Sequence, residues 1–175
     1  HFVSQAQTVV SREVIPIHPA VVTIGVFQGG TAANIIPERV RLSGTVRTLH
    51  AEARDTAEAA LKRLAAGLEP GFRVRCEMEY RRGVPPLVND DRVLEPVMAS
   101  VRRQFGAAVI EEGEPSMGAE DFAEFAALMP AFQLRIGAGA PGRDDRLHNA
   151  RYQPDERCIG LGVQALSRAA LDILA

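Results

Sequence analysis

The sequence is short of several features that mark large classes of protein. Its 175 residues include two cysteines, no tryptophan and 5% aromatic residues, and its formal net charge is only −2. Two cysteines far apart in the chain do not make a disulfide framework, so a cytoplasmic location is expected. Without a basic excess or an aromatic stacking platform, we expect no nucleic-acid partner. No apolar run is long enough to cross a bilayer, and we expect no membrane partner.

Short motifs of several enzyme classes are absent as well. The sequence has no GxSxG elbow, no GxGxxG turn and no phosphate loop. Their absence disfavours serine hydrolases, dinucleotide-binding proteins and kinases. There is also no HxH, HExxH or CxxC spacing of the kind that accompanies many metal sites.

What the sequence does contain is a loop followed by a strand pattern in residues 29–47. The loop begins with two adjacent glycines, which allow close backbone approaches, and it includes Asn34. From Val40 to Arg47 apolar and polar residues alternate, as in a half-buried strand. Because residues 20–28 are rich in β-branched side chains, we expect two strands that pair antiparallel across this loop.

Patterns on either side of this hairpin extend it to a small domain. A helical pattern opens the chain, and residues 51–68 form an amphipathic helix pattern that Pro70 and Gly71 are expected to end. Residues 72–80 then alternate, with Cys76 facing inward as a core thiol. This order of elements, a helix, two strands, a helix and a strand, predicts most of an α+β sandwich whose first strand is missing.

The second half of the chain follows a different pattern. A Pro-Pro pair within residues 83–90 marks the expected domain boundary. Beyond it the elements are typical of an α/β domain, although too short to close a sheet of their own. The expected elements are a helix at 91–105, a short strand near Val109, a helix after Met117 with Glu120 and Asp121 in its first turn, a buried strand at 131–139 and a closing helix at 155–174.

Three residues could carry binding or chemistry. His148 lies in a loop ahead of a helix, where a metal ligand can be presented, although a loop histidine is more often a surface residue. Arg47 and Asn34 offer a planar fork and an amide, which suit a carboxylate. An arginine on the polar face of a strand is, however, commonly just solvated. The residue types alone leave both interpretations open.

Three stretches together resemble the C-terminal half of a known enzyme family. They are SREVIPIHPAVVTIGVFQGGTAANIIPERVRLSGTVRTL (11–49), MGAEDFAEF (117–125) and LHNARYQPDE (147–156). In the right order and over essentially the whole chain, the sequence is similar to the dinuclear zinc aminoacylase and carboxypeptidase G family. The nearest branch is hippurate hydrolase, an N-acyl-L-amino acid amidohydrolase.

The resemblance implies an α/β metallohydrolase of two domains, which forms a homodimer through a lid domain. Residues 1–83 would be this lid, an α+β sandwich of antiparallel sheet and two helices without its first strand. Residues 84–175 would be the C-terminal α/β part of a zinc-peptidase-like catalytic domain. In such enzymes a metal-bound water attacks the amide of an N-acyl amino acid or small peptide, and a glutamate acts as general base.

The resemblance also assigns roles to single residues. His148 matches a metal-ligand histidine, Asn34 and Arg47 match lid positions that hold the substrate carboxylate, and Gly118 begins a stretch that lines the cleft. The full-length enzyme would bind two zinc ions, or manganese or cobalt. The other ligands and the paired glutamates of the family have no counterpart, so we expect no general base, no bound metal and no hydrolysis in this chain alone. A non-catalytic dimerisation or small-molecule-binding module is the alternative.

Overall fold

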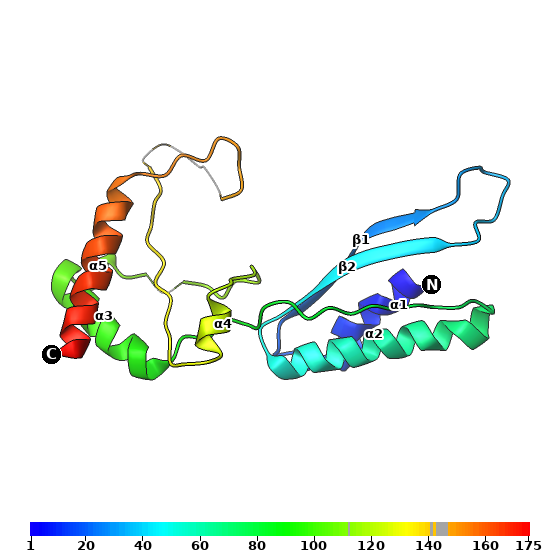
Figure 1. The fold of residues 1–175 in the computed structure, drawn as a ribbon, viewed down its shortest axis with the longest axis horizontal. Coiled ribbons are helices and arrows are strands. Elements are labelled where there is room, and N and C mark those ends of the chain that lie inside the picture. The colour runs from blue at the N-terminus through cyan, green and yellow to red at the C-terminus, as the bar shows by residue number, and fades with distance from the viewer. Residues whose placement is uncertain (112, 141, 143–146) are drawn as a thin grey trace. The chain divides into compact units, whose positions relative to one another are not determined.

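The computed structural model describes residues 1–111, 113–140, 142 and 147–175 (Figure 1). These residues form two compact units. The first unit comprises His1–Pro86 together with Ser116–Glu120, and the second comprises Leu87–Pro115 together with Asp121–Ala175. The expected mixed α/β architecture, with an antiparallel sheet and helices, is confirmed. Of the helices in the described residues, none is both long and apolar enough to cross a membrane.

The first unit is built on the predicted hairpin. β1 (Ala20–Gly29) and β2 (Val40–Thr48) pair antiparallel, from Ala20 opposite Thr48 to Gly29 opposite Val40. The register shifts between Ile24 and Val26, so Gly25 is an extra residue in β1, as in a β-bulge. A Cβ atom at Gly44 would lie 2.0 Å from the carbonyl oxygen of Thr23, so the two strands approach closely at this position only because Gly44 has no side chain.

Three helical elements cover the base of this hairpin. They are α1 (Phe2–Thr8), the π-helical turn η1 (Val9–Glu13) and α2 (Ala51–Phe72). Alanines at helical spacing let α2 lie close to the strands, and with Leu61 they form its buried face. The buried core consists of Ala6, Val9, Val14, Val22, Ala53, Ala57, Ala60 and Leu61. Farther along the hairpin the apolar side chains are exposed, with Phe27 at 69%.

Two expectations for the first unit are corrected. α2 does not end at Pro70 but continues to Phe72, followed by Arg73 in the left-handed conformation with φ of 55°. Pro70 removes one intrahelical N–H donor, and the helix extends only two residues beyond it. Residues 73–80 are extended but are not a strand. A strand needs a neighbour for its backbone N–H and C=O groups, and among the described residues this segment has none.

The second unit is dominated by two helices. α3 (Asp91–Phe105) and α5 (Arg157–Leu174) pack through Val97, Val101, Ala165 and Ala169. The Asp90 side chain caps α3 by accepting a hydrogen bond from the Arg92 N–H at 2.9 Å. The fully buried Ser100 donates its hydroxyl to Asp172 at 2.6 Å, which joins the two helices.

Several predicted elements of the second unit are also corrected. The segment near Val109 is a 3₁₀ turn, η2 (Ala107–Val109), rather than a strand. The helix after Met117 is only the short α4 (Ala123–Ala126), and Glu120 and Asp121 precede it. Residues 131–139 form no strand, because among the described residues their backbone makes only isolated hydrogen bonds to other backbone groups. These run from the Asp90 N–H to the Ala131 carbonyl and from the Asp155 N–H to the Ala138 carbonyl, both at 2.9 Å. The sequence GAPGRDDR (139–146) predicts a mobile loop, and most of these residues lie outside the part of the chain that the structure describes.

Candidate functional site

Arg47 lies near the base of the hairpin on the exposed side of β2, opposite Val21. Its Nη1 atom donates a hydrogen bond to the carbonyl oxygen of Met117 at 2.6 Å. A guanidinium carries five N–H donors in a planar fork, so one bond leaves donors for a further acceptor. The side chain is thus oriented by a fixed partner while it stays accessible to an anionic group.

Gly118 lies next to this partner in a tight turn. The Gly118 N–H donates to the Ser116 hydroxyl oxygen at 3.1 Å, which closes the turn around Met117. A Cβ atom at Gly118 would lie 3.3 Å from the same hydroxyl oxygen, so a side chain there would press on the Ser116 hydroxyl that closes the turn. The first unit therefore brings two candidate residues, Arg47 and Gly118, into one neighbourhood although they are far apart in sequence.

Asn34 occupies a different place. It lies exposed in the loop between β1 and β2, where the Ile35 N–H donates to the Ala32 carbonyl at 3.3 Å. The loop begins after Gly29 and ends before Val40, at the end of the hairpin opposite to Arg47. Arg47 lies seven residue steps along β2 from Val40, which corresponds to about 23 Å. Within one chain the structure does not bring Asn34 and Arg47 together.

His148 belongs to the second unit and is exposed in a turn. Its φ of 64° is in the left-handed region, which residues other than glycine adopt rarely and histidine more often than most. Immediately afterwards the Asn149 side chain accepts a hydrogen bond from the Arg151 N–H at 2.9 Å. Because uncommon backbone conformations gather at functional sites, this one supports a role for His148.

A metal site requires more donors than these residues supply. A structural or catalytic zinc site uses three or four protein ligands. Within the part of the chain that the structure describes, no three residues among His, Cys, Asp and Glu lie close enough together to hold a metal ion. His148 can therefore supply one ligand at most. The described residues alone do not fit a metal centre, and further donors would have to come from elsewhere.

Sequence reasoning missed the partners that orient the candidate residues. The Met117 carbonyl acts through a tertiary contact and the Ser116 hydroxyl through a turn contact, and neither contact can be predicted from the pattern of residue types. Near the start of α5, Arg157 holds the pKa of Asp155 down at about 2 by hydrogen bonds from its side chain and its backbone. Since Asp155 is committed to this contact, it stabilises the helix start rather than offering a free carboxylate.

Comparison with known proteins gives a consistent result. Residues 5–172 match the family described as peptidase family M20/M25/M40. N-acetyldiaminopimelate deacetylase from Shouchella clausii is 35% identical over 164 residues, which cover 94% of this chain and 43% of the relative. Relatives from other bacteria carry the same name at 32–36% identity. The chain thus spans less than half the length of these curated relatives.

Solved structures agree with the sequence relatives. A crystal structure from methicillin-resistant Staphylococcus aureus is 33% identical, with a TM-score of 0.88 over 99% of this chain and 45% of that one. The Bacillus subtilis YXEP protein, described as a dinuclear metal-binding peptidase from the M20 family, is 25% identical with a TM-score of 0.78 over the same shares. Both similarities extend through the two units of this chain.

Proposed function

This chain belongs to peptidase family M20/M25/M40, and from that premise we propose that it is the C-terminal part of a metal-dependent amidohydrolase. The enzyme hydrolyses the amide bond of N-acyl amino acids, hippurate-like substrates included, or of small peptides. One observation carries the proposal: the similar relatives are named N-acetyldiaminopimelate deacetylase, and an N-acetylated diamino acid is itself an N-acyl amino acid. Deacetylation and hippurate hydrolysis break the same type of bond.

In this proposal Arg47 binds the carboxylate of the substrate. Support comes from its exposed guanidinium, which the Met117 carbonyl orients without using all its donors. Gly118 shapes the same neighbourhood, because its N–H closes the turn that holds the Met117 carbonyl and a side chain there would press on the Ser116 hydroxyl. A carboxylate that is held in a fixed place positions the amide bond for attack.

The carboxylate assignment is tested by kinetics in the longer enzyme. Arg47→Ala should raise KM for N-acetyl and N-benzoyl amino acids by about tenfold to a hundredfold, which corresponds to the loss of a charge-assisted hydrogen bond. The KM for matching amides without the carboxylate should not change. Arg41→Ala is the matched control, because Arg41 is an exposed arginine on the same face of β2. Equal effects on both substrate classes would refute the assignment.

We further propose that His148 is one ligand of the metal centre, which holds zinc or, alternatively, manganese or cobalt. The remaining ligands and the general base belong to the part of the enzyme that this chain does not contain. His148→Ala should lower the bound metal per enzyme and reduce turnover by at least about a hundredfold. His1→Ala is the control histidine, and full metal content in His148→Ala would contradict the ligand role.

A homodimer gives Asn34 a place in the same site. Since Val40, at the loop end of β2, lies about 23 Å from Arg47 along the strand, one chain cannot bring both side chains to one carboxylate. We propose that Arg47 of one protomer acts with Asn34 of the partner subunit. Mixing Asn34→Ala with Arg47→Ala enzyme should then restore part of the activity that each variant alone has lost. If the mixture stays as inactive as its components, the shared site is refuted.

The second candidate function is a non-catalytic dimerisation or small-molecule-binding module. It is favoured by one observation, that the described residues hold no group of three metal ligands. Light scattering after size-exclusion chromatography of the 175-residue chain tests it, since a dimer without hydrolysis supports this function and a monomer counts against it. Both free cysteines suit the cytoplasmic location that we propose in either case.

A further inference from the structure

Residues 73–82 are held on the first unit in an unusual way. The segment runs back along α2 in an extended conformation (Figure 1), and among the described residues none makes a backbone–backbone hydrogen bond with it. Its half-buried side chains alternate with exposed ones, and Met78 and Tyr80 pack against the core. Side chains therefore have to provide what a strand ladder normally provides.

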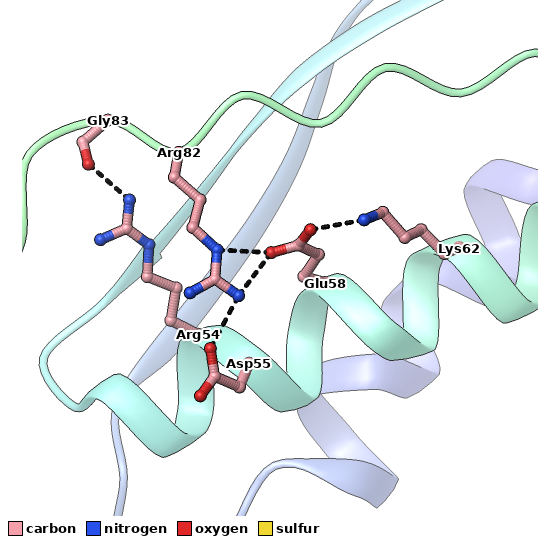
Figure 2. Close-up of polar contacts among 6 residues, drawn as sticks. All are labelled: Arg54, Asp55, Glu58, Lys62, Arg82 and Gly83. Atoms are coloured by element: carbon pink, nitrogen blue, oxygen red, sulfur yellow. Dashed lines mark hydrogen bonds and ion pairs between the residues drawn. The ribbon is translucent and has the colours of Figure 1, made fainter.

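At the end of this segment an ionic cluster joins it to α2 (Figure 2). The Arg82 guanidinium contacts Asp55 at 2.7 Å and Glu58 at 2.6 Å, and both its Nη2 and Nε atoms reach the same Glu58 oxygen. The other Glu58 oxygen accepts from Lys62 at 2.6 Å. The Glu58 side chain is only 14% exposed, so it is the most enclosed member of the cluster.

A second contact runs in the opposite direction. Arg54 on α2 reaches out with its Nη2 atom and donates a hydrogen bond to the Gly83 carbonyl (Figure 2). One arginine thus extends from the segment to the helix, and the other extends from the helix to the backbone of the segment. Two reciprocal contacts restrain both the position and the orientation of residues 82 and 83, which a single contact would not.

The electrostatics keep this cluster charged at neutral pH. Hydrogen bonds from Lys62 and then from Arg82 hold the pKa of Glu58 below its ordinary value. The same Glu58, followed by Asp55, raises the pKa of Arg82. Burial raises the pKa of the nearby Tyr80 hydroxyl, so this residue stays neutral. No proton has to be gained or lost for the contacts to persist.

We propose that Arg82 and Arg54 form a latch that fixes residues 78–83 on α2. The order of α2 then extends to Gly83 along this segment. Without the latch, only the packing of Met78 and Tyr80 and the hydrogen bond from the Cys76 N–H to Glu69 would hold the segment on the first unit. The inference does not depend on the proposed substrate.

Nuclear magnetic relaxation of the 175-residue chain tests the latch. Backbone amides of residues 78–83 should show the same high order parameters as those of α2, and the amide of Val84 should be the first to show a lower value. In Arg82→Ala and Arg54→Ala the order parameters of residues 78–83 should fall, with the largest loss at residues 82 and 83. If residues 82 and 83 are already as disordered as Val84 in the unchanged chain, the latch is refuted.

Proteolysis after Glu77 and Glu79 tests the two arginines separately. A glutamate-specific protease should cleave there about threefold to tenfold faster in Arg82→Ala and in Arg54→Ala than in the unchanged chain. Arg81→Ala is the control for Arg82, because the Arg81 side chain is 84% exposed and pairs with Glu79 inside the segment. Arg63→Ala is the control for Arg54, because Arg63 is also on α2 but pairs with Glu13.

The proposal fails if the latch variants are cleaved no faster than their controls. It also fails if the whole first unit becomes equally sensitive, since the arginines would then support the fold in general. Glu58→Gln keeps the shape of the side chain and should show the same local acceleration. High salt offers a measurement without any substitution: it should speed cleavage in the unchanged chain and have little effect in Arg82→Ala.

Discussion

The two units of this chain bury apolar surface to very different extents. In the first, two strands and three helical elements enclose a core of eight buried residues. In the second, four buried residues join α3 to α5, while Ile159, Leu166 and Leu171 on α5 are 65%, 54% and 63% exposed. A helix with an exposed apolar stripe is stable mainly when another surface covers it. The first unit is therefore more self-sufficient than the second.

The largest expected effect tests the hairpin on which the first unit depends. Gly44→Ala places a Cβ atom 2.0 Å from the Thr23 carbonyl oxygen, a backbone atom that cannot move away alone. We expect a loss of about 4 kcal/mol in the free energy of unfolding, measured with urea. Gly25→Ala is the control, because no atom lies within 4 Å of its added Cβ, and it should cost less than about 1 kcal/mol.

The next effect compares the two cores directly. Leu61 is 3% exposed, and Leu61→Ala should lower the free energy of unfolding by about 3 kcal/mol through lost burial and a cavity. Leu166→Ala, at a position that is 54% exposed, should cost less than about 1 kcal/mol in the same chain. In the longer enzyme the cost of Leu166→Ala should rise if other residues cover α5. Equal costs at both positions would remove the contrast between the units.

A smaller effect concerns the hydrogen bond between Ser100 on α3 and Asp172 on α5 in the second unit. The hydrogen bond from Ser100, followed by that from Arg103, lowers the pKa of Asp172. The stability that this lowered pKa contributes is fully present when the pH is above 3.8, the ordinary pKa of an aspartate. It is lost as the pH falls through the lower pKa of Asp172 in the folded state. Ser100→Ala should lower the thermal midpoint of this unit by about 3 °C at pH 7 and by less at pH 3. A constant difference across that range would contradict the ionic contribution.

The smallest effect is local to the start of α5. The Asp155 carboxyl should titrate near pH 2 in a carbon-detected magnetic resonance experiment, because Arg157 stabilises its charged form. Its contribution to stability is complete above about pH 4 and disappears as the pH falls towards 2. In Arg157→Ala the titration should return towards 3.8, with little change in the first unit. An unchanged titration would exclude Arg157 as the cause.

Some structural features could be predicted from residue patterns because their causes are local. The antiparallel hairpin followed from alternation in residues 40–47 and from the glycines before it, and α3 followed from apolar spacing in residues 91–105. Strands at 72–80 and 131–139 were predicted with equal clarity and are not formed. A pattern shows which side chains face inward, but a ladder also needs a neighbouring strand.

The candidate site shows the same division. The resemblance to a known family, and not residue type alone, assigned Arg47 to the substrate carboxylate and His148 to the metal, and both stay predictions. Only the folded chain places Arg47 on the Met117 carbonyl, 70 residues away in sequence, and Asn34 at the opposite end of the hairpin. The separation of Asn34 from Arg47 cannot be calculated from their spacing in the sequence, because it depends on the register and length of two paired strands.

By itself the sequence determined the family, the hairpin and the amphipathic helices, since these depend on residue order and on periodicities of two and 3.6. The tertiary structure alone decided which extended segments become strands, which arginine meets which acceptor, and where the first unit ends. The physical reason is that backbone pairing, charge-assisted hydrogen bonds and core contacts each require two partners. A sequence pattern identifies only one of the two partners, and the tertiary structure determines which residue is the other.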